Sequence, residues 1–429
     1  MRKKILIVNP PVFTPKPWNN VENGSMGPYV LASFLKAKGE EVALFDFLTE
    51  RRGLDGWEDV RVERVAKVGN YEEEHLSKRI YYAGASERHY IDYLKAYKPD
   101  EVWISCLFTF YWQGAKLVYD VTKEFNPLIN IKLGGNYPTL CTDHARENFS
   151  DARIEASDPC DMRRFQNIDI GLYRAIPRMF PILTSIGCHF SCSWCAVPKL
   201  EGSTMKFKDP HDVVSDIEEK YHYGVRSFRF IDSHLLADYE AHFKLMLEEL
   251  IGKPWRAELH SYGGLNSLYV TQEMLELMAE AGFVRIQLPI ETIDEGMLKN
   301  NNRAVSVRMW EMAVKRLHRI NRFAVVSYVL CGIPGQTIKD IYRTINFVED
   351  HGVTPVPLFF TPIPGTRYEV KRPLEDIHPY LFPYASGEMP ASELERIQSN
   401  YYTGGVFVSE IIEGSKTIYK SGSAVKVGT

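Results

Sequence analysis

Three cysteines, Cys188, Cys192 and Cys195, lie within eight residues of the chain. Their C-x3-C-x2-C spacing brings three thiolates together on one tight loop, and thiolates are the ligands that iron–sulfur clusters require. A cubane cluster needs four ligands, so three cysteines leave one iron open. One alternative is a structural zinc site, but His189 stands directly beside Cys188, unlike the usual zinc-finger spacings. Another alternative is that the three cysteines are incidental. The spacing favours a [4Fe-4S] cluster with an open iron.

The elements that must position this loop alternate between strand and helix signals from about residue 180. Asp209-Pro210 is typical of a helix start, and Thr337 with Asp340 resembles a capping box. Six βα units predict parallel strands joined by right-handed crossovers, and six are too few to close an eight-stranded barrel. We therefore expect an open, partial (β/α)6 barrel over 180–365, with the cysteines just after its first strand. The expected strands lie at 182–186, 226–232, 256–261, 284–290, 324–331 and 356–361.

An α/β pattern also fills residues 1–160, interrupted by a polar, aromatic-rich insertion from about 49 to 98. The pattern predicts a Rossmann-like, doubly wound parallel sheet, whose ligands would lie at the carboxyl ends of its strands. No G-x-G-x-x-G sequence is present, so a dinucleotide is not the expected ligand. Residues 366–429 form a C-terminal extension whose role cannot be inferred from its pattern. In the N-terminal part, strands are expected at 4–8, 41–45, 101–105 and 129–133, and helices at 28–38 and 114–125.

The composition is that of a globular protein, with 429 residues, 45% hydrophobic and 25% charged side chains and a net charge of -4. This charge gives no general basic field, so we do not expect a nucleic acid as partner. No apolar run has the length of a transmembrane helix, and the N-terminus has no signal-peptide pattern, so we expect a cytoplasmic protein. Seven cysteines, an odd number with three clustered, suit metal ligation in a reducing compartment.

The segment from Thr184 to Cys195 resembles the signature of the radical S-adenosylmethionine (radical SAM) superfamily, including the aromatic Trp194 before the last cysteine. The resemblance covers residues 180–365 and implies a partial (β/α)6 barrel. It also implies that the open iron binds the methionine moiety of S-adenosylmethionine. By this resemblance the cofactor would contact residues after five of the strands: Trp194 at the adenine, Asp232 at the methionine amino group, Glu291 and Thr292 at the ribose, and Gly332, Pro334, Gly335 and Pro362 around the adenine pocket.

A Rossmann-like domain ahead of this barrel resembles the class of the superfamily that has an N-terminal cobalamin-binding domain. The D-x-H-x-x-G motif that supplies a histidine to cobalt in many corrinoid proteins is absent, so the lower cobalt face would be unliganded or covered by a side chain such as Tyr111 or Trp112. The alternative is that the aromatic stretch is core and the domain holds no corrin. The residues expected near cobalamin are Asn9, Pro10, Ser105, Thr109, Tyr111, Gly134, Gly135 and Asn136.

These resemblances imply an enzyme that cleaves S-adenosylmethionine to a 5′-deoxyadenosyl radical and methylates an unactivated carbon of a small molecule with cobalamin. Its electron donor would be a ferredoxin or a flavodoxin. One alternative is a cobalamin-free radical rearrangement, cyclisation or oxidation, and another is a corrinoid- or metal-binding carrier without radical turnover. The sequence identifies neither the substrate nor a catalytic acid or base. Methylthiotransferases carry three further cysteines for a second cluster, but Cys106, Cys141 and Cys160 lack their local motifs, and burial explains them and Cys331 better.

Overall fold

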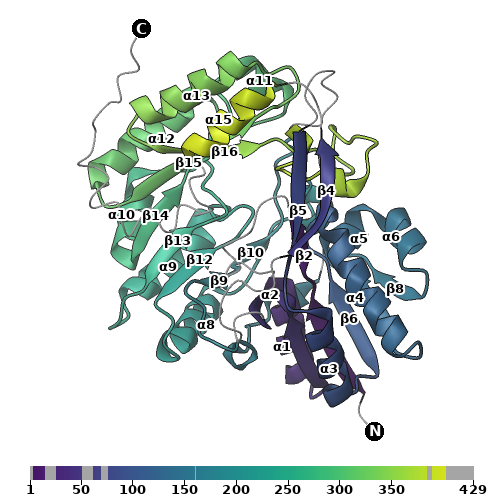
Figure 1. The fold of residues 1–429 in the computed structure, drawn as a ribbon. Coiled ribbons are helices and arrows are strands. Elements are labelled where there is room, and N and C mark those ends of the chain that lie inside the picture. The colour runs from purple at the N-terminus through teal and green to yellow at the C-terminus, as the bar shows by residue number, and fades with distance from the viewer. Residues whose placement is uncertain are drawn as a thin grey trace.

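The computed structural model describes residues 3–14, 26–50, 61–68, 76–159, 161–383 and 389–401. It contains two parallel sheets in separate units, one drawn in purple and blue and the other in teal and green (Figure 1). Within these ranges, no helix combines the length and the apolar character needed to span a bilayer.

The first sheet has five parallel strands in the order β3-β1-β6-β7-β8. Renumbered along the chain within this sheet, the order is 2-1-3-4-5, which is the flavodoxin-like form of the doubly wound fold. The expected Rossmann-like architecture is therefore confirmed, and the strand order reverses between β1 and β6. The short fifth strand was not predicted. The strands are β1 (Lys4–Asn9), β3 (Glu41–Asp46), β6 (Glu101–Ser105), β7 (Asn130–Gly134) and β8 (Ala152–Glu155).

The helix α3 (Glu87–Tyr97) lies in the segment expected as an insertion, yet it packs onto this sheet. Tyr90 and Leu94 are fully buried, and the Tyr90 hydroxyl lies 2.9 Å from Thr122 Oγ1 of α4 (Trp112–Phe125). The inserted segment therefore contains one of the layer's own helices. The other helical elements of this unit are α1 (Met26–Ala37), α2 (Phe47–Glu50), η3 (Thr109–Tyr111), α4 (Trp112–Phe125), α5 (Asn136–Leu140) and α6 (Thr142–Asn148).

A small antiparallel sheet accompanies the first unit, with the strand order β2-β5-β4. It pairs β2 (Val12–Thr14), which directly follows β1, with β5 (Leu76–Ala83), and β5 with β4 (Arg61–Val68). The rest of the inserted segment thus adds strands beside the parallel sheet.

The second sheet has six parallel strands in the order β16-β15-β14-β13-β12-β9, which is the order of the chain. Among the described strands no pairing joins β16 to β9, so the expected open, partial barrel is confirmed. Its strands are β9 (Phe180–Ile182), β12 (Ser227–Phe230), β13 (Glu258–Ser261), β14 (Phe283–Gln287), β15 (Ala324–Cys331) and β16 (Thr354–Phe359). Its helical elements are α8 (Pro210–His222), η6 (Tyr239–Phe243), α9 (Lys244–Ile251), α10 (Gln272–Ala281), α11 (Glu295–Asn300), α12 (Val307–Ile320) and α13 (Ile338–Asp350), with η7 (Leu374–Asp376) and α15 (Ala391–Tyr401) in the C-terminal extension.

The strand expected at 182–186 is two strands in the structure. After β9, the short strand β10 (Ser185–Ile186) pairs antiparallel with β11 (Lys206–Phe207). The break has a local cause, because the N–H groups of Thr184 and Ser185 donate to the Asp232 carboxylate instead of to a neighbouring strand. The cysteine loop therefore begins from a hairpin that is distinct from the barrel strand.

The expected helix starts are present. Asp209 accepts a hydrogen bond from the His211 N–H at the start of α8, with a proline in the first turn. At the start of α13, Thr337 and Asp340 form the reciprocal capping box, with N–H donors at 3.3 and 3.0 Å from the side-chain oxygens. Such caps stabilise a helix start by about 1 kcal/mol each.

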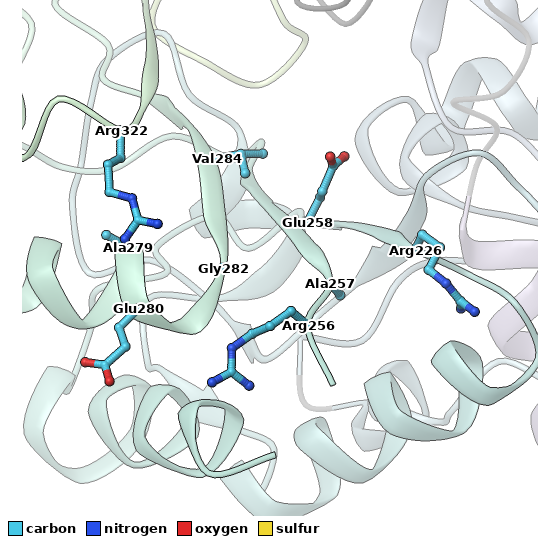
Figure 2. A pocket seen from close by; sticks show the side chains of 9 residues that line it. All are labelled: Arg226, Arg256, Ala257, Glu258, Ala279, Glu280, Gly282, Val284 and Arg322. Atoms are coloured by element: carbon cyan, nitrogen blue, oxygen red, sulfur yellow. The ribbon is translucent and has the colours of Figure 1, made fainter. Parts of the chain in front are cut away.

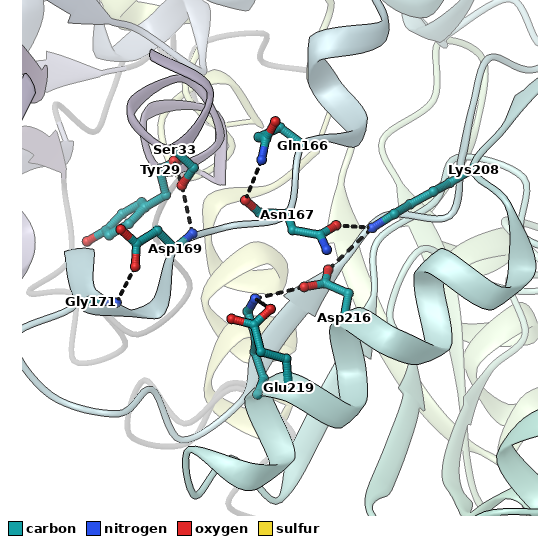
Figure 3. Close-up of polar contacts among 10 residues, drawn as sticks. Tyr29, Ser33, Gln166, Asn167, Asp169, Gly171, Lys208, Asp216 and Glu219 are labelled. Carbon is teal, nitrogen blue, oxygen red and sulfur yellow. Dashed lines mark hydrogen bonds and ion pairs between the residues drawn. The ribbon is translucent and has the colours of Figure 1, made fainter. Parts of the chain in front are cut away.

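A linker between the two units contacts both (Figure 3). The Asp169 N–H donates to Ser33 Oγ of α1 at 2.8 Å, which ties the linker to the first unit. On the other side, Lys208 Nζ contacts Asn167 Oδ1 of the linker and lies 3.4 Å from Asp216 of α8. Residues 167–169 therefore join the first unit to the barrel through polar contacts.

An aromatic stack reinforces this junction. The rings of Tyr29 in α1 and Tyr173 in the linker are nearly parallel, with centroids 4.3 Å apart. Tyr173 also contacts Phe180 of β9 at a centroid distance of 5.7 Å. The first strand of the barrel and the first helix of the N-terminal unit are thus coupled through one residue.

Candidate functional site

The three cysteines lie on the loop between β10 and β11, at the carboxyl end of the first barrel strand. Gly187 enters this loop with φ of 103°, and a Cβ there would lie 2.6 Å from the Thr204 carbonyl oxygen, so only glycine fits. The Cys188 N–H donates to the Gly202 carbonyl at 3.1 Å. All three thiols are free and partly buried.

The other side of the cysteine loop is held by the residues that follow α11. The Ser193 N–H donates to the Asn301 carbonyl at 3.0 Å, and Asn302 Nδ2 donates to the Ser191 carbonyl at 3.3 Å. Because both sides of the loop are hydrogen-bonded to the protein, the backbone around the cysteines is already positioned without a metal.

Glu201 holds the entry to the loop. Its Oε2 accepts from the Gly187 N–H at 3.2 Å and from Ser233 Oγ at 2.9 Å, and its Oε1 pairs with Arg164 of the linker at 2.8 Å. Glu201 was not among the expected site residues. Glu201 is positioned by the short helix α7 (Val197–Glu201), which follows the last cysteine. The sequence pattern did not indicate this helix.

The arrangement of the cysteines suits a cluster better than a single ion. Among the described residues, no group of three or more His, Cys, Asp or Glu side chains converges on one metal-ion position. A cubane does not require this convergence, because each thiolate binds a different iron. Zinc would require a fourth ligand, and the His189 ring instead contacts the Tyr269 hydroxyl at 3.2 Å. Three free thiols on a hydrogen-bonded loop thus fit a [4Fe-4S] cluster.

Burial raises the pKa of the Cys188 and Cys192 thiols and raises the pKa of Cys195 to about 11. Arg303 lies beside Cys192 and opposes the rise of its pKa. Metal binding must release the thiol protons, and burial makes this release less favourable. The binding of iron would therefore have to supply the free energy of deprotonation.

Asp232 is fully buried at the end of β12, and one of its oxygens is committed to the start of the cysteine loop. Its Oδ1 accepts from the Thr184 and Ser185 N–H groups at 2.9 and 2.5 Å and from both hydroxyls at 2.8 Å. Its Oδ2 has no partner among the described residues. Burial raises the pKa of Asp232 to about 6, although the four hydrogen bonds lower it. The expected position after the second barrel strand therefore holds a carboxylate with one oxygen available.

Glu291 follows β14 in an unusual backbone conformation, with φ of 67°, which only a few per cent of non-glycine residues adopt. Its Oε1 lies 3.5 Å from Arg303 Nη2, and burial raises the pKa of this carboxyl while Arg303 lowers it. Because Arg303 also lies beside Cys192, it links the expected ribose residue to the cluster loop. Sequence reasoning missed Arg303, since nothing local distinguishes it from a surface arginine.

The other residues expected near S-adenosylmethionine differ in their surroundings. The Thr292 hydroxyl is buried and accepts from the Asp294 N–H at 3.2 Å, so it helps to start α11. Trp194 is partly buried beside the last cysteine. Gly332 is positioned by Gln336, whose Oε1 accepts from its N–H at 2.8 Å. Pro334 and Gly335 lie at the exposed tip of this turn, whereas Pro362 is buried after β16.

The expected corrin residues follow β1, β6 and β7, beside the reversal of strand order between β1 and β6, where ligands of open α/β sheets bind. Asn9 ends β1, but its amide donates to Asp46 Oδ1 at 2.8 Å, while Tyr29 donates to the other oxygen at 2.7 Å. Asn9 therefore serves a buried polar cluster at this edge. Ser105 ends β6, Pro10 follows β1, and Gly134 ends β7.

The loop after β6 packs closely against the loop after β7. A Cβ on Gly135, whose φ is 104°, would lie 2.4 Å from the Cys106 carbonyl oxygen, so glycine permits this close approach. Asn136 then begins α5, and Thr109 is buried in η3. The expected corrin residues thus lie at or after the carboxyl ends of β1, β6 and β7.

The C-terminal extension contacts the aromatic loop after β6, which comprises residues 108–112. The buried His378 ring contacts Phe110 and Tyr111 at centroid distances of 4.7 and 5.9 Å, and Trp112 Nε1 donates to Glu375 Oε2 at 3.0 Å. Burial lowers the pKa of His378 to about 3. Sequence reasoning missed these contacts, which join positions more than 260 residues apart. Cys160 and the rest of the extension, 384–388 and 402–429, lie outside the described residues.

A surface pocket of about 700 Å³ lies at the opposite, amino end of the barrel strands and contains none of the expected site residues (Figure 2). Its arginines precede β12, β13 and β15 and stand among acidic side chains. The residues that line it are Arg226, Arg256, Ala257, Glu258, Ala279, Glu280, Gly282, Val284 and Arg322.

Residues 182–348 match the family model described as the Radical SAM superfamily. Among curated proteins, the chain is 23% identical over 252 residues to the bacteriochlorophyllide d C-12(1)-methyltransferase of Chlorobaculum tepidum, covering 54% of this chain and 54% of that protein. It is 22% identical over 279 residues to a tRNA-2-methylthio-N(6)-dimethylallyladenosine synthase of Corynebacterium glutamicum, covering 60% of this chain and 52% of that protein. The chain therefore spans about half the length of these curated relatives.

Solved structures resemble both units together. The radical S-adenosylmethionine methyltransferase TsrM from Kitasatospora setae, solved with tryptophan substrate and an S-adenosylmethionine analogue, aligns with a TM-score of 0.62 and 16% identity over 84% of this chain and 73% of that one. The cobalamin-dependent S-adenosylmethionine radical enzyme OxsB, solved with aqua-cobalamin and S-adenosylmethionine, aligns with a TM-score of 0.55 and 13% identity over 90% of this chain and 56% of that one. These similarities establish the fold.

The Asp232 carboxyl gives a prediction about stability. Its pKa is raised in the folded protein, from 3.8 to about 6, so the folded state holds the proton more tightly than the unfolded state. The free energy of unfolding should therefore fall as pH rises from about 4 to 6, by up to about 3 kcal/mol from this group. Asp232→Asn should remove this fall, which urea unfolding of the metal-free protein between pH 4 and 7 would measure.

The exposed Asp212 in the first turn of α8 provides a matched control. Asp212→Asn should keep the wild-type dependence on pH. An Asp232→Asn variant whose stability followed the wild-type pH curve would contradict the assignment of this titration to Asp232.

Proposed function

The chain contains a radical SAM domain, and on this premise we propose that it cleaves S-adenosylmethionine reductively and uses cobalamin to methylate an unactivated carbon of a small molecule. The observation that carries the proposal is the loop of three free cysteines at the carboxyl end of an open six-stranded barrel. The adjoining sheet, with its 2-1-3-4-5 order, supports the cobalamin part because its switch point lies at the expected corrin residues.

Cys188, Cys192 and Cys195 would hold the cluster. When bound, the cluster would supply the electron that splits S-adenosylmethionine into methionine and a 5′-deoxyadenosyl radical, and cobalamin would supply the methyl group. The guanidinium of Arg303 beside Cys192 would offset part of the negative charge of the ligating thiolates. A ferredoxin or flavodoxin is the proposed source of the electron.

Asp232 is proposed to receive the methionine amino group. Its unpartnered Oδ2 is an acceptor for an ammonium, and an approaching positive charge favours the ionised carboxylate that burial disfavours. The same carboxylate fixes Thr184 and Ser185 through Oδ1. Binding of the ammonium would thus be linked to the position of the cysteine loop.

The remaining contacts with S-adenosylmethionine are proposed as the family resemblance implies them. Glu291 would bind the ribose hydroxyls, for which a carboxylate is a suitable bidentate acceptor, while Arg303 balances its charge. Thr292 would act mainly by ordering the turn after Glu291, since its hydroxyl accepts a hydrogen bond from the Asp294 N–H. Trp194 and the backbone near Gly332, Pro334, Gly335 and Pro362 would enclose the adenine.

At the edge of the N-terminal sheet, the corrin would lie over Pro10, Ser105, Thr109, Gly134, Gly135 and Asn136. Tyr111 would cover the lower cobalt face together with the neighbouring rings. Phe108 supports this role for the loop, because the residue is 43% exposed while its ring stacks on Phe110 at a centroid distance of 5.2 Å. The C-terminal residues around His378 would hold the aromatic loop in place through their contacts with Phe110 and Tyr111.

Replacement of Cys188, Cys192 or Cys195 by alanine should abolish the iron–sulfur absorbance and the formation of 5′-deoxyadenosine, because a cubane held by two protein thiolates lacks a ligand. Anaerobic reconstitution, absorbance near the charge-transfer bands and chromatography of the products measure both. Cys141→Ala and Cys331→Ala are matched controls and should retain cluster and cleavage. A reducible [4Fe-4S] signal in the triple variant would show that these cysteines are not the ligands.

Bound cobalamin should have no nitrogen ligand on its lower face. The chain lacks the D-x-H-x-x-G motif that supplies such a ligand. Near the aromatic loop, His144 Nδ1 contacts the Tyr137 hydroxyl at 2.7 Å. The His378 ring packs on Phe110, and its Nδ1 accepts from the Tyr380 N–H at 3.1 Å, while its Nε2 has no partner among the described residues. Electron paramagnetic resonance of bound cob(II)alamin should therefore lack nitrogen hyperfine splitting. If splitting appeared and vanished in His378→Ala, the histidine-free geometry would be wrong, and failure to bind hydroxocobalamin would remove the corrin from the proposal.

Turnover with an authentic substrate should release 5′-deoxyadenosine and S-adenosylhomocysteine in comparable amounts. Cobalamin-dependent methylation of this kind consumes S-adenosylmethionine twice, once as the source of the radical and once as the methyl donor. Quantitative mass spectrometry with methyl-labelled S-adenosylmethionine measures both products and the label on the substrate carbon. Product formed with 5′-deoxyadenosine but without S-adenosylhomocysteine would favour a rearrangement, cyclisation or oxidation.

A further inference from the structure

A row of basic side chains crosses three neighbouring strands of the barrel. Arg229 of β12 is the register partner of His260 of β13, and His260 is the register partner of Arg285 of β14. Register partners point to the same face of a sheet, so the three side chains lie side by side. All three are buried, with Arg285 only 3% exposed.

This row faces the inside of the barrel. Side chains alternate between the faces of a strand, and the neighbours on the other face, Phe230, Leu259 and Ile286, belong to the apolar core that includes the surrounding helices.

A second polar layer lies one step nearer the carboxyl ends. The Tyr262 ring lies 5.7 and 5.2 Å from the guanidinium carbons of Arg229 and Arg285.

Gln287 extends the polar face two residues beyond Arg285 on the same strand. Its Oε1 accepts a hydrogen bond from the Tyr328 hydroxyl at 2.5 Å, and its Nε2 has no partner among the described residues. The Gln287 amide therefore has a free N–H donor, while its acceptor oxygen is occupied by the Tyr328 hydroxyl.

Arg285 is a buried guanidinium with two of its three nitrogens unpartnered. Its Nε and Nη1 have no hydrogen-bond acceptor, and among the described residues no Asp or Glu forms an ion pair with it. A buried charge without a partner costs several kcal/mol, so such groups are ordinarily paired. Burial and the nearby Arg285 lower the pKa of His260 to about 4, so the imidazole is neutral at pH 7 and cannot share the role of a cation.

We propose that Arg285 and Gln287 bind the carboxylate of the substrate inside the barrel. This inference rests on the proposed function and names the substrate class as small carboxylic acids. A guanidinium forms paired, charge-assisted hydrogen bonds with a carboxylate, and the Gln287 Nε2 supplies a further donor. Tyr262 and Tyr328 offer ring faces and edges to the carbon skeleton beyond it.

The position of the pair on the strands suits an anchor. Arg285 lies in the middle of β14, whereas Asp232 and Glu291 lie beyond the carboxyl ends of β12 and β14, on the side of the cysteine loop. A substrate held by its carboxylate at Arg285 would extend toward that end, where the radical is generated. We expect a carboxylate rather than a phosphate dianion because His260, which lies between Arg285 and Arg229 in the row, is neutral at pH 7.

The arginines of the pocket in Figure 2 differ from Arg285 because they have hydrogen-bond acceptors or acidic neighbours. Arg226 and Arg256 are exposed and donate to backbone carbonyls, and Glu258 and Glu280 lie among them. That pocket therefore supplies its own acceptors. Arg322, exposed at the same end of the barrel, provides a control variant far from the inner face.

Isothermal titration of the oxidised holoenzyme with benzoate, benzamide and phenyl phosphate tests the proposal. Benzoate should bind at least tenfold more tightly than benzamide, which has the same shape without the charge, and more tightly than phenyl phosphate. Arg285→Gln and Gln287→Glu should each weaken benzoate binding at least tenfold and change benzamide binding less than twofold. Arg322→Gln should leave all three affinities unchanged.

Gln287→Glu keeps the size of the side chain and places a carboxylate beside Arg285, so it tests the proposal even if Arg285→Gln does not fold. Circular dichroism and thermal midpoints establish which variants are folded. Equal affinities for benzoate and benzamide, absence of benzoate binding, or unchanged benzoate affinity in the folded variants would overturn the proposal. Tighter binding of phenyl phosphate than of benzoate would overturn the assignment of a carboxylate.

Cluster absorbance and cleavage of S-adenosylmethionine by the unaltered protein report on the proposed function independently. Loss of benzoate selectivity with intact cleavage overturns only the substrate class. Benzoate selectivity without cleavage overturns only the radical function and leaves a carboxylate-binding barrel.

Discussion

The buried carboxylate of Asp232 is the interaction on which the arrangement of the site depends. One of its oxygens accepts four hydrogen bonds from Thr184 and Ser185, at the point where the first barrel strand stops and the cysteine loop begins. A full negative charge in this buried position is unfavourable, and four donors offset much of that cost. The strand break, the direction of the loop and the free oxygen beside it all follow from this one contact.

The remaining supports of the cysteine loop come from distant parts of the chain. Glu201 connects it to the linker through Arg164, the turn after α11 supplies a carbonyl and an amide, and the backbone at Arg367 donates to Ser193 at 3.3 Å. A cluster loop held in this way needs little ordering when iron binds, because the entropy of its backbone has already been lost in folding. The same linker also contacts α1, so the two units share the scaffold of the site.

The barrel separates its two faces by chemistry. Toward the helices the strands present apolar side chains that form one continuous core. Toward the inside they present arginine, histidine, glutamine and tyrosine, whose burial is favourable only if partners are supplied. A barrel that met folding requirements alone would fill this space with branched apolar residues. The polar inner face is therefore a departure from the most stable solution, as is common where a protein binds a ligand.

Local sequence patterns were enough to predict most strands, the cysteine loop and two helix starts. Strand signals predicted five barrel strands close to their observed positions, whereas the first was expected at 182–186 and lies at Phe180–Ile182. The spacing of Cys188, Cys192 and Cys195 predicted the cluster loop, and the caps at Asp209 and Thr337 predicted two helix starts, because these features depend on residues close in the chain. The sequence also predicted that the residues after the strands lie at one edge, because parallel strands bring their carboxyl ends together.

Which distant side chains meet became visible in the folded protein alone. Arg303 lies between Cys192 and Glu291, His378 lies on Phe110, and Arg229, His260 and Arg285 form a row, although each residue alone resembles an ordinary polar position. These contacts depend on strand register and on the path of the linker and the C-terminal extension. Such features arise from packing between segments far apart in the chain, and no local pattern encodes them.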